Sequence, residues 1–288
     1  MKKNVIILAL FAIFLSACNT PTTVKTGEKQ PTASLELKSV KVIDNIPYRE
    51  GGSKSWKLDL AMPENFGTTP RPAIVIVHGG GWRAGSKKDL VYRDLLLDYA
   101  FQGYLTVSVE YRFDQETAFP ACIEDVKCAV RWLRAHAKEY NVDPDRIGAF
   151  GHSAGAHLVL MLAMSSDNKS LEGDGGWNEY SSKINAVVGG STPTQIGAKR
   201  ANWNKPEWRP VGYISKNTVP MLLIQGIQDP IVKVDLVDDF VAKMKAAGAP
   251  DLSYIRIEGG DHDVAYSDSL RITKPAMDEF FKKHLNPE

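Results

Sequence analysis

A serine placed between two glycines offers the clearest chemistry in this sequence. Residues 151–155 read Gly-His-Ser-Ala-Gly and directly follow a strand-like segment at 146–150. Glycines on both sides of a serine let the backbone make the tight strand-to-helix turn that exposes the serine hydroxyl. We therefore predict that Ser153 is a nucleophile in acyl transfer. The alternative is a glycine-rich turn in which Ser153 only caps the helix that follows.

A nucleophilic serine needs two partners. A neutral imidazole must take the hydroxyl proton, and a carboxylate must fix the tautomer of that imidazole. Asp229 follows an apolar segment at 221–225, and His262 follows another at 252–257. We predict that Ser153, Asp229 and His262 form a catalytic triad. Three competing acids lie in or near an expected helix and should be solvated; they are Asp235, Asp238 and Asp239. Two more, Asp261 and Asp263, adjoin His262 too closely in sequence to orient its ring easily.

A second glycine cluster could supply hydrogen-bond donors. Residues 78–82 read His-Gly-Gly-Gly-Trp and follow the apolar run at 73–77. A triple glycine lets main-chain N–H groups turn toward the negative oxygen that develops on an ester carbonyl during attack. We predict that the N–H groups of Gly80, Gly81 and Ala154 form this oxyanion hole, with Trp82 as an alternative donor. The competing interpretation is a flexible loop without a role.

These candidates require a scaffold of alternating strands and helices. The pattern predicts strands at 35–46, 56–61, 73–77, 104–109, 146–150, 184–188, 221–225 and 252–257, and helices at 89–101, 121–140, 153–164, 234–247 and 275–284. Such alternation implies right-handed crossovers and an α/β fold, with a mainly parallel central sheet flanked by helices. The triad members then follow strand ends, where open α/β sheets place their chemistry. One domain is expected at 35–288.

With these motifs in view, residues 56–285 resemble α/β hydrolases of the esterase and lipase superfamily that carry an HGGG-type oxyanion loop. Further segments are similar to the BD-FAE group of bacterial carbohydrate-ester hydrolases, which includes feruloyl and acetyl xylan esterases; they lie at 111–112, 119–120, 125–127, 130–134 and 143–148. The resemblance implies a cofactor-free acyl-enzyme mechanism on a small-molecule or polysaccharide ester. Ala156 and the Ser-Thr-Pro-Thr run at 191–194 depart from the pattern of the group.

Tryptophans around the glycine loop and in the insertion at 165–218 could set specificity. Trp82, Trp177, Trp203 and Trp208 could form a lid or an aromatic platform for a sugar or a phenolic acid. They could equally be anchors of the core or of loops. The run Glu-Gly-Asp-Gly-Gly at 172–176 lacks calcium-ligand spacing and is interpreted as a solvated turn.

The first seventeen residues have the pattern of a signal peptide. Two lysines precede an apolar run at 5–15 that is too short to span a membrane. Residues 15–18, Leu-Ser-Ala-Cys, resemble the lipobox of bacterial lipoproteins, which implies cleavage before Cys18 and its acylation. Residues 18–34 would then tether the protein to the cell envelope, and Asn19 favours the outer membrane. An ordinary secretory signal is the alternative.

Composition excludes several other classes. The chain has 35 Lys plus Arg against 34 Asp plus Glu in 288 residues, so no charge pattern for nucleic-acid binding is present. The histidines and cysteines have no zinc-ligand spacing, so no metal is expected. Cys122 and Cys128 lie six residues apart in an expected helix, about 9 Å along its axis, which is too far for a disulfide.

The sequence therefore predicts a lipid-anchored serine esterase that de-esterifies carbohydrate. A general short-chain carboxylesterase or a serine peptidase would use the same triad, because a fold does not fix its substrate. A non-catalytic glycan-binding lipoprotein with this fold is the third alternative, and it predicts a broken triad.

Overall fold

A mixed sheet organises the computed structural model, which describes residues 39–64, 67–196, 205–265 and 269–287. Its eight strands run in the order β1-β2-β4-β3-β5-β6-β7-β8. β1 and β2 are antiparallel to their neighbours, whereas β3 to β8 are parallel to one another. The strands are β1 (Val40–Pro47), β2 (Lys57–Pro63), β3 (Arg71–Val77), β4 (Leu105–Val109), β5 (Val142–His152), β6 (Ala186–Gly190), β7 (Met221–Gly226) and β8 (Leu252–Ile257).

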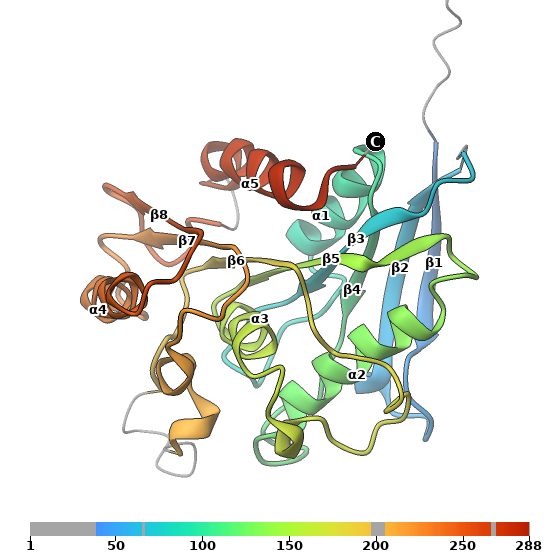
Figure 1. The fold of residues 1–288 in the computed structure, drawn as a ribbon, viewed down its shortest axis with the longest axis horizontal. Coiled ribbons are helices and arrows are strands. Elements are labelled where there is room, and N and C mark those ends of the chain that lie inside the picture. The colour runs from blue at the N-terminus through green and yellow to red at the C-terminus, as the bar shows by residue number, and fades with distance from the viewer. Residues whose placement is uncertain (1–38, 65–66, 197–204, 266–268, 288) are drawn as a thin grey trace, which may run out of the picture. The chain divides into compact units, whose positions relative to one another are not determined.

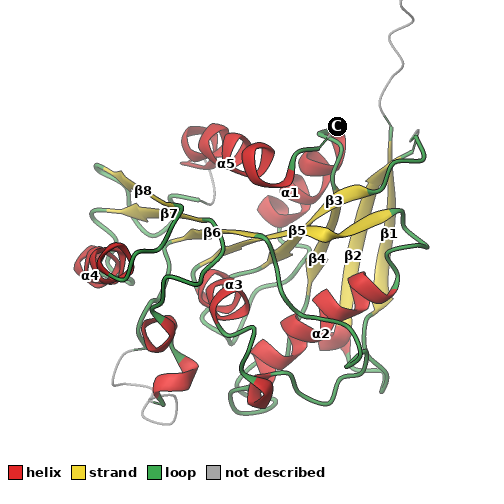
Figure 2. Ribbon diagram, in the orientation of Figure 1, coloured by secondary structure: helices red, strands yellow, loops and turns green. Residues whose placement is uncertain are grey.

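Helices cover both faces of the sheet (Figures 1 and 2). α1 (Leu90–Phe101) and α5 (Leu270–Leu285) lie on one face, and α2 (Ala121–Ala135), α3 (Ala154–Met164) and α4 (Val234–Ala246) lie on the other. Each face has its own hydrophobic core. β3 shows why, since Val75 packs with α2 to α4 and the neighbouring Ile74 packs with α1 and α5. Side chains alternate across a strand, so a continuous apolar run serves both cores.

Short 3-10 segments complete the described elements. They are η1 (Lys54–Trp56), η2 (Lys169–Leu171), η4 (Pro206–Trp208) and η5 (Pro210–Tyr213). The last two belong to the tryptophan-containing insertion and lie on the α3 face of the sheet (Figure 1). The leader, Cys18 and the tether expected at 1–34 lie outside the described residues, as does Trp203.

Each predicted strand is present, but two predicted helix boundaries are wrong. The helix expected at 121–140 ends at Ala135, because the chain must turn back into β5 and does so through Asn141 in the left-handed region at φ 53°. The helix expected to begin at Pro275 begins at Leu270. Its extra turn is held by the buried Thr273 hydroxyl, which donates to the Val264 carbonyl at 3.0 Å, so Pro275 lies inside the helix.

Other structural findings concern cysteines, metals and membranes. Cys122 and Cys128 are buried and unpaired, as predicted. Across the described ranges, no three side chains of His, Cys, Asp or Glu gather in a way that could hold a metal ion. Within those same ranges, no helix combines the length and the apolar character that membrane crossing requires.

Candidate active site

The predicted nucleophile lies in a strained turn between β5 and α3. Ser153 has φ 54° and ψ −119°, a combination that non-glycine residues rarely adopt, and its N–H donates to the Gly190 carbonyl at 2.9 Å. Both flanking glycines are required by close backbone approach. A Cβ at Gly151 would lie 2.3 Å from the Gly155 carbonyl oxygen, and one at Gly155 would lie 2.1 Å from that of Val77. The turn therefore holds the serine at the carboxyl end of the sheet.

The structure brings the three predicted triad side chains together. Nε2 of His262 lies 2.9 Å from Oγ of Ser153, and Nδ1 of the same ring lies 2.9 Å from Oδ2 of Asp229. Asp229 follows β7 and His262 follows β8. This is the hydrogen-bond order that lets an imidazole take a proton from a serine while a carboxylate stabilises the resulting charge.

Several donors fix the Asp229 carboxylate. Oδ1 accepts the N–H groups of Ile231 and Val232, both at 2.8 Å, and Oδ2 accepts from Nε2 of Gln225 at 3.0 Å. Burial raises the pKa of Asp229, but hydrogen bonds from His262 and from the two N–H groups outweigh it and hold that pKa below its ordinary value. Asp229 therefore stays ionised and keeps the proton of His262 on Nδ1, which leaves Nε2 free to accept from Ser153.

Two residues that sequence reasoning did not assign hold the backbone of His262, the predicted general base. The carbonyl of His262 accepts from Nε2 of His152 at 2.8 Å and from Oγ of Ser191 at 2.6 Å. Both donors are buried. The only sequence signal for His152 was its position next to Ser153. Ser191 had no such signal, because it lies in the run at 191–194 that departs from the family pattern. Together they fix the loop that presents His262.

Removing the Ser191 donor should slow turnover without abolishing it. In Ser191→Ala the His262 carbonyl keeps the hydrogen bond from His152 but loses the one from Ser191. If His262 is held less well in the transition state, kcat should fall about tenfold with little change in KM. Steady-state kinetics on p-nitrophenyl acetate would measure this. Ser165→Ala is the matched control, since Ser165 is also a buried serine that donates to a carbonyl, that of Met161. Equal kcat values for the two variants would contradict the positioning role.

The predicted oxyanion loop makes a tight turn after β3. Gly80, Gly81 and Trp82 all have positive φ, at 113°, 61° and 61°. The Gly80 carbonyl accepts the N–H groups of Arg83 and Ala84, and a Cβ at Gly80 would lie only 1.9 Å from the Ala84 oxygen. The turn therefore requires glycine at position 80.

The third predicted donor lies beside the nucleophile. Ala154 is the first residue of α3, where an N–H group has no acceptor within the helix. β3 pairs with β5, with Val77 opposite Gly151, so the loop at 78–82 and Ala154 start from neighbouring strand ends. Their use as oxyanion donors stays a prediction.

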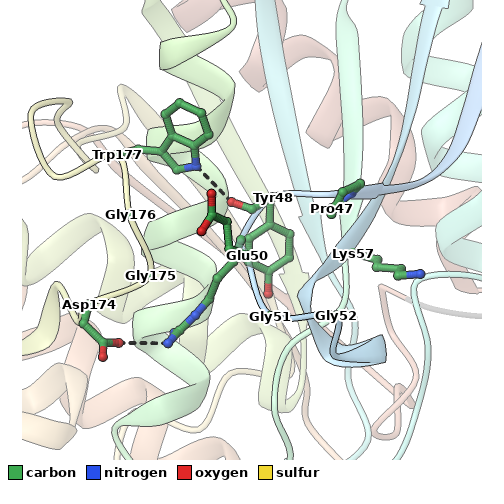
Figure 3. A pocket seen from close by; sticks show the side chains of 11 residues that line it. Pro47, Tyr48, Glu50, Gly51, Gly52, Lys57, Asp174, Gly175, Gly176 and Trp177 are labelled. Atoms are coloured by element: carbon green, nitrogen blue, oxygen red, sulfur yellow. Dashed lines mark hydrogen bonds and ion pairs between the residues drawn. The ribbon is translucent and has the colours of Figure 1, made fainter.

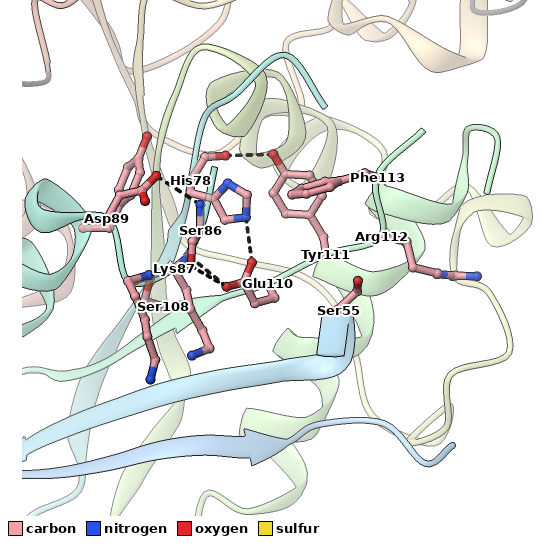
Figure 4. Close-up of polar contacts among 12 residues, drawn as sticks. Ser55, His78, Ser86, Lys87, Asp89, Ser108, Glu110, Tyr111, Arg112 and Phe113 are labelled. Atoms are coloured by element: carbon pink, nitrogen blue, oxygen red, sulfur yellow. Dashed lines mark hydrogen bonds and ion pairs between the residues drawn. The ribbon is translucent and has the colours of Figure 1, made fainter. Parts of the chain in front are cut away.

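A buried polar network anchors the base of this loop (Figure 4). The His78 ring lies with Nδ1 2.7 Å from the Gly79 carbonyl and Nε2 3.1 Å from the Glu110 carboxylate, and it stacks on Tyr111 at 4.4 Å. The Tyr111 hydroxyl donates to the His78 carbonyl at 3.0 Å. Each ring nitrogen thus faces an acceptor, and both the ring and the main chain of His78 are held.

Glu110 joins this network to the segment after the loop. Its Oε1 accepts from the Ser86 hydroxyl at 2.8 Å and from the Lys87 N–H at 3.2 Å. Burial raises the pKa of Glu110, but the contacts with His78, Ser86 and Lys87 hold it below its ordinary value. The ionised carboxylate therefore ties both ends of the segment 78–87 to β4.

The three predicted tryptophans that lie in the described residues do not form one platform. Trp82 is buried, with its ring edge-on to His157 at 5.2 Å, and the Trp208 carbonyl accepts from Nε2 of His157 at 3.0 Å. Both tryptophans thus contact His157 of α3, whose N–H donates to the Ser153 carbonyl one helical turn earlier. Trp177 lies elsewhere, with its indole N–H donating to the Tyr48 carbonyl at 3.0 Å. The anchor alternative therefore describes the buried Trp82, and the structure separates Trp177 from the other two.

The acidic run at 172–176 is more than a solvated turn. Asp174 is exposed as predicted, but Glu172 pairs with the buried side chains of Lys127 at 2.8 Å and Arg131 at 2.7 Å, and it accepts from the Ser182 hydroxyl at 2.8 Å. The prediction was wrong at Glu172 because the partners lie on α2, more than 40 residues earlier in the chain.

Two buried histidines should make the stability of the fold depend on acid. Burial lowers the pKa of His152 and of His157 to about 4, against an ordinary value of 6.5. Between these values the unfolded chain binds protons that the folded protein does not. The free energy of unfolding is therefore fully retained above about pH 6.5 and falls toward pH 4, by up to about 1.4 kcal/mol per pH unit for each histidine.

Denaturant unfolding at a series of pH values would measure this slope. His157→Gln should reduce the slope between pH 6.5 and 4 by the contribution of one histidine, because glutamine does not titrate and His152 still does. An unchanged slope in that variant would contradict the prediction.

The fold and this site define an α/β hydrolase with an assembled Ser-His-Asp triad. The BD-FAE family model matches residues 58–207, slightly more than half of the chain. The chain therefore belongs to the BD-FAE family.

Individual proteins that this chain resembles carry esterase names. Esterase LipC of Mycobacterium tuberculosis is 25% identical over 266 residues, which cover 85% of this chain and 66% of LipC, so the chain spans just under two thirds of that relative. Esterase 2 of Thermogutta terrifontis with bound propionate is 27% identical with a TM-score of 0.72, covering 87% of this chain and 96% of that one. A truncated carbohydrate esterase from gut microbiota shares the fold at 24% identity and a TM-score of 0.72, covering 85% and 97%.

Proposed function

We propose that this protein is a serine carboxylic-ester hydrolase that removes acetyl or feruloyl groups from carbohydrate. The observation that carries the proposal is the unbroken hydrogen-bonded series from Asp229 through His262 to Ser153, with both distances at 2.9 Å. Membership of the BD-FAE family supports the ester and the carbohydrate parts of the proposal. The names of LipC and of Thermogutta terrifontis esterase 2 support the ester part.

Acylation follows from the geometry. Oγ of Ser153 attacks the ester carbonyl carbon while Nε2 of His262 takes its proton, and the negative charge moves to the carbonyl oxygen. The N–H groups of Gly80, Gly81 and Ala154 are assigned to that oxygen, and Asp229 stabilises the imidazolium. His262 then gives its proton to the leaving sugar oxygen as the ester bond breaks, which leaves an acyl group on Ser153.

Deacylation repeats these steps with water. Nε2 of His262 takes a proton from a water molecule, whose oxygen attacks the acyl carbon. The bond to Ser153 then breaks, the proton returns to its Oγ, and the carboxylic acid leaves. Apart from the substrate and water, the scheme uses only groups of the chain itself.

A substrate panel with soluble protein from residue 35 onward tests the proposal. The panel comprises p-nitrophenyl acetate, p-nitrophenyl butyrate, acetylated xylan, methyl ferulate and a peptide amide. We expect release of acetate from xylan or cleavage of the ferulate ester. Activity on the nitrophenyl esters alone would instead identify a general short-chain carboxylesterase, and activity on the amide alone would identify a peptidase. If no substrate of the panel is hydrolysed, the result would favour a non-catalytic glycan-binding protein.

We also propose that the protein is anchored in the bacterial cell envelope by acylation of Cys18, facing away from the cytoplasm at the outer membrane. The support is the sequence pattern at 1–18. Metabolic labelling with an alkyne fatty acid should mark the wild-type protein and not Cys18→Ser. Labelling of both would contradict the anchor.

A further inference from the structure

A pocket without any triad residue lies at the β1 edge of the sheet (Figure 3). Its volume is about 800 Å³, which is in the range of small-molecule sites. Residues 174–177 lie on one side and Pro47 and Lys57 on the other, with Gly51 and Gly52 between them. The two glycines have positive φ and present main chain rather than side chains to the pocket.

This pocket and the nucleophile lie at the same end of the sheet. Pro47 pairs with Lys57 at one end of β1 and β2, and the adjoining Leu58 pairs with Val109 of β4. Val109 is opposite Val77 of β3, and Val77 is opposite Gly151 of β5, two residues before Ser153. Four strand spacings separate β1 from β5, which corresponds to about 19 Å. An extended polymer could therefore contact both places along one rim.

The aromatic wall of the pocket is rigid. Trp177 has φ 58°, a left-handed conformation that is an outlier for a bulky side chain. Its indole N–H donates to the Tyr48 carbonyl at 3.0 Å, and the His136 ring packs edge-on against it at 4.9 Å. The surrounding contacts thus hold a strained tryptophan in one place, as happens where a side chain must be ready for a ligand.

The loop that carries Trp177 is attached to α2 along its length. Nε of Arg131 donates to the Gly176 carbonyl at 3.1 Å, and Sγ of Cys128 donates to the Gly175 carbonyl at 3.2 Å. Glu172 pairs with Arg131 at 2.7 Å. Because these contacts form when the protein folds, a ligand would not have to order the loop, and this reduces the cost of binding.

The charges of the pocket are balanced. Arg49 pairs with Asp174 at 2.9 Å and with the buried Asp125 at 3.5 Å, and its guanidinium stacks over Trp56. The remaining charged lining residues are one cation, Lys57, and one exposed anion, Glu50. A balanced set of charges has no preference for an anion or a cation. It does offer planar hydrogen-bonding groups beside an indole, which suits a neutral polyhydroxylated ring.

We propose that this pocket binds neutral sugar residues of the polysaccharide chain whose ester lies at Ser153. The inference rests on the proposed function, which it deepens by naming a second contact for a polymeric substrate. Trp177 supplies an apolar face for a sugar ring, and the polar groups of Arg49 and Asp174 hydrogen-bond its hydroxyls. Small esters do not reach the pocket, so it contributes to polymer binding and not to the chemistry at Ser153.

Binding and kinetics together test this proposal. Calorimetric titration of Ser153→Ala with xylohexaose, which carries no ester, should show binding that weakens about tenfold when Trp177→Ala is added. In the active enzyme, Trp177→Ala should raise KM for acetylated xylan by about the same factor and leave KM for p-nitrophenyl acetate unchanged. Gly52→Asn is a second variant, which should weaken binding by adding a side chain at the lining of the pocket. It should fold, because asparagine tolerates a left-handed φ and a Cβ there meets no atom within 4 Å.

Tyr180→Ala is the matched control, since Tyr180 is an exposed aromatic residue three positions further on the same loop and does not line the pocket. Weaker binding in Trp177→Ala and Gly52→Asn, with Tyr180→Ala unchanged, supports the proposal. Hydrolysis of acetylated xylan that is equal in wild type and in both pocket variants overturns it and leaves the proposed function intact. Pocket-dependent binding of xylohexaose without hydrolysis of any carbohydrate ester supports the pocket and contradicts the proposed function.

Discussion

Ser153→Ala is expected to lose about five to six orders of magnitude in kcat and to fold normally. The variant removes the attacking oxygen, which is the hydroxyl that lies 2.9 Å from Nε2 of His262. The main-chain contacts of residue 153 do not involve the hydroxyl, because its N–H donates to Gly190 and its carbonyl accepts from His157. Hydrolysis of p-nitrophenyl acetate, compared at equal concentrations of folded protein, would measure the loss.

A covalent label gives an independent readout for the same variant. An organophosphate should add one adduct mass to the wild-type protein and none to Ser153→Ala. Near-normal turnover in the variant, or an unchanged adduct, would place the nucleophile elsewhere. Ser165→Ala serves as the control for a serine substitution, because Ser165 lies at the opposite end of α3 from Ser153.

Asp229→Asn should have the next largest effect, a fall in kcat of about 10⁴. If the amide oxygen takes the place of Oδ1, it still accepts from Ile231 and Val232, but the amide NH₂ then faces Nδ1 of His262 and Nε2 of Gln225, which are donors in the native protein. His262 would have to move its proton to Nε2 to accept this hydrogen bond. A ring protonated at Nε2 cannot take the proton of Ser153.

The control for this variant is Asp235→Asn. Asp235 was a competing acid in the sequence and lies exposed in the first turn of α4. We expect full activity and a near-normal thermal midpoint in Asp235→Asn, whereas Asp229→Asn should fold with a lower midpoint because its amide faces two donors. A loss of activity in Asp235→Asn as large as that in Asp229→Asn would contradict the assignment of the triad acid.

The sheet and the meeting of the triad side chains could be predicted because both follow from local patterns. The run at 73–77 is apolar at every position, as a strand buried on both faces requires, and β3 is buried throughout. Ser153, Asp229 and His262 each follow a predicted strand. Parallel strands end at a common edge, so three positions far apart in the chain could be expected to converge there.

Contacts between distant main-chain and side-chain atoms could not be predicted in the same way. The bonds from Ser191 and His152 to the His262 carbonyl span 71 and 110 residues. No spacing in the sequence encodes them, because they depend on how two loops face each other after the strands have paired. Trp177 is a similar case, since its indole partner is the carbonyl of Tyr48, 129 residues away.

The place of β8 has a consequence for when the protein becomes active. β5, which precedes Ser153, is flanked by β3 and β6, whereas β8 lies at one edge of the sheet and pairs only with β7 in the described structure. His262, the predicted general base, therefore follows the last strand to be synthesised. During synthesis, the Ser153 hydroxyl should therefore stay unreactive until β8 has paired with β7. Local unfolding of β8 would likewise abolish activity while most of the sheet was still paired. On gradual heating, esterase activity should therefore be lost at a lower temperature than the overall secondary structure. The rate of hydrolysis would then measure the folding of the β8 edge and not that of the whole sheet.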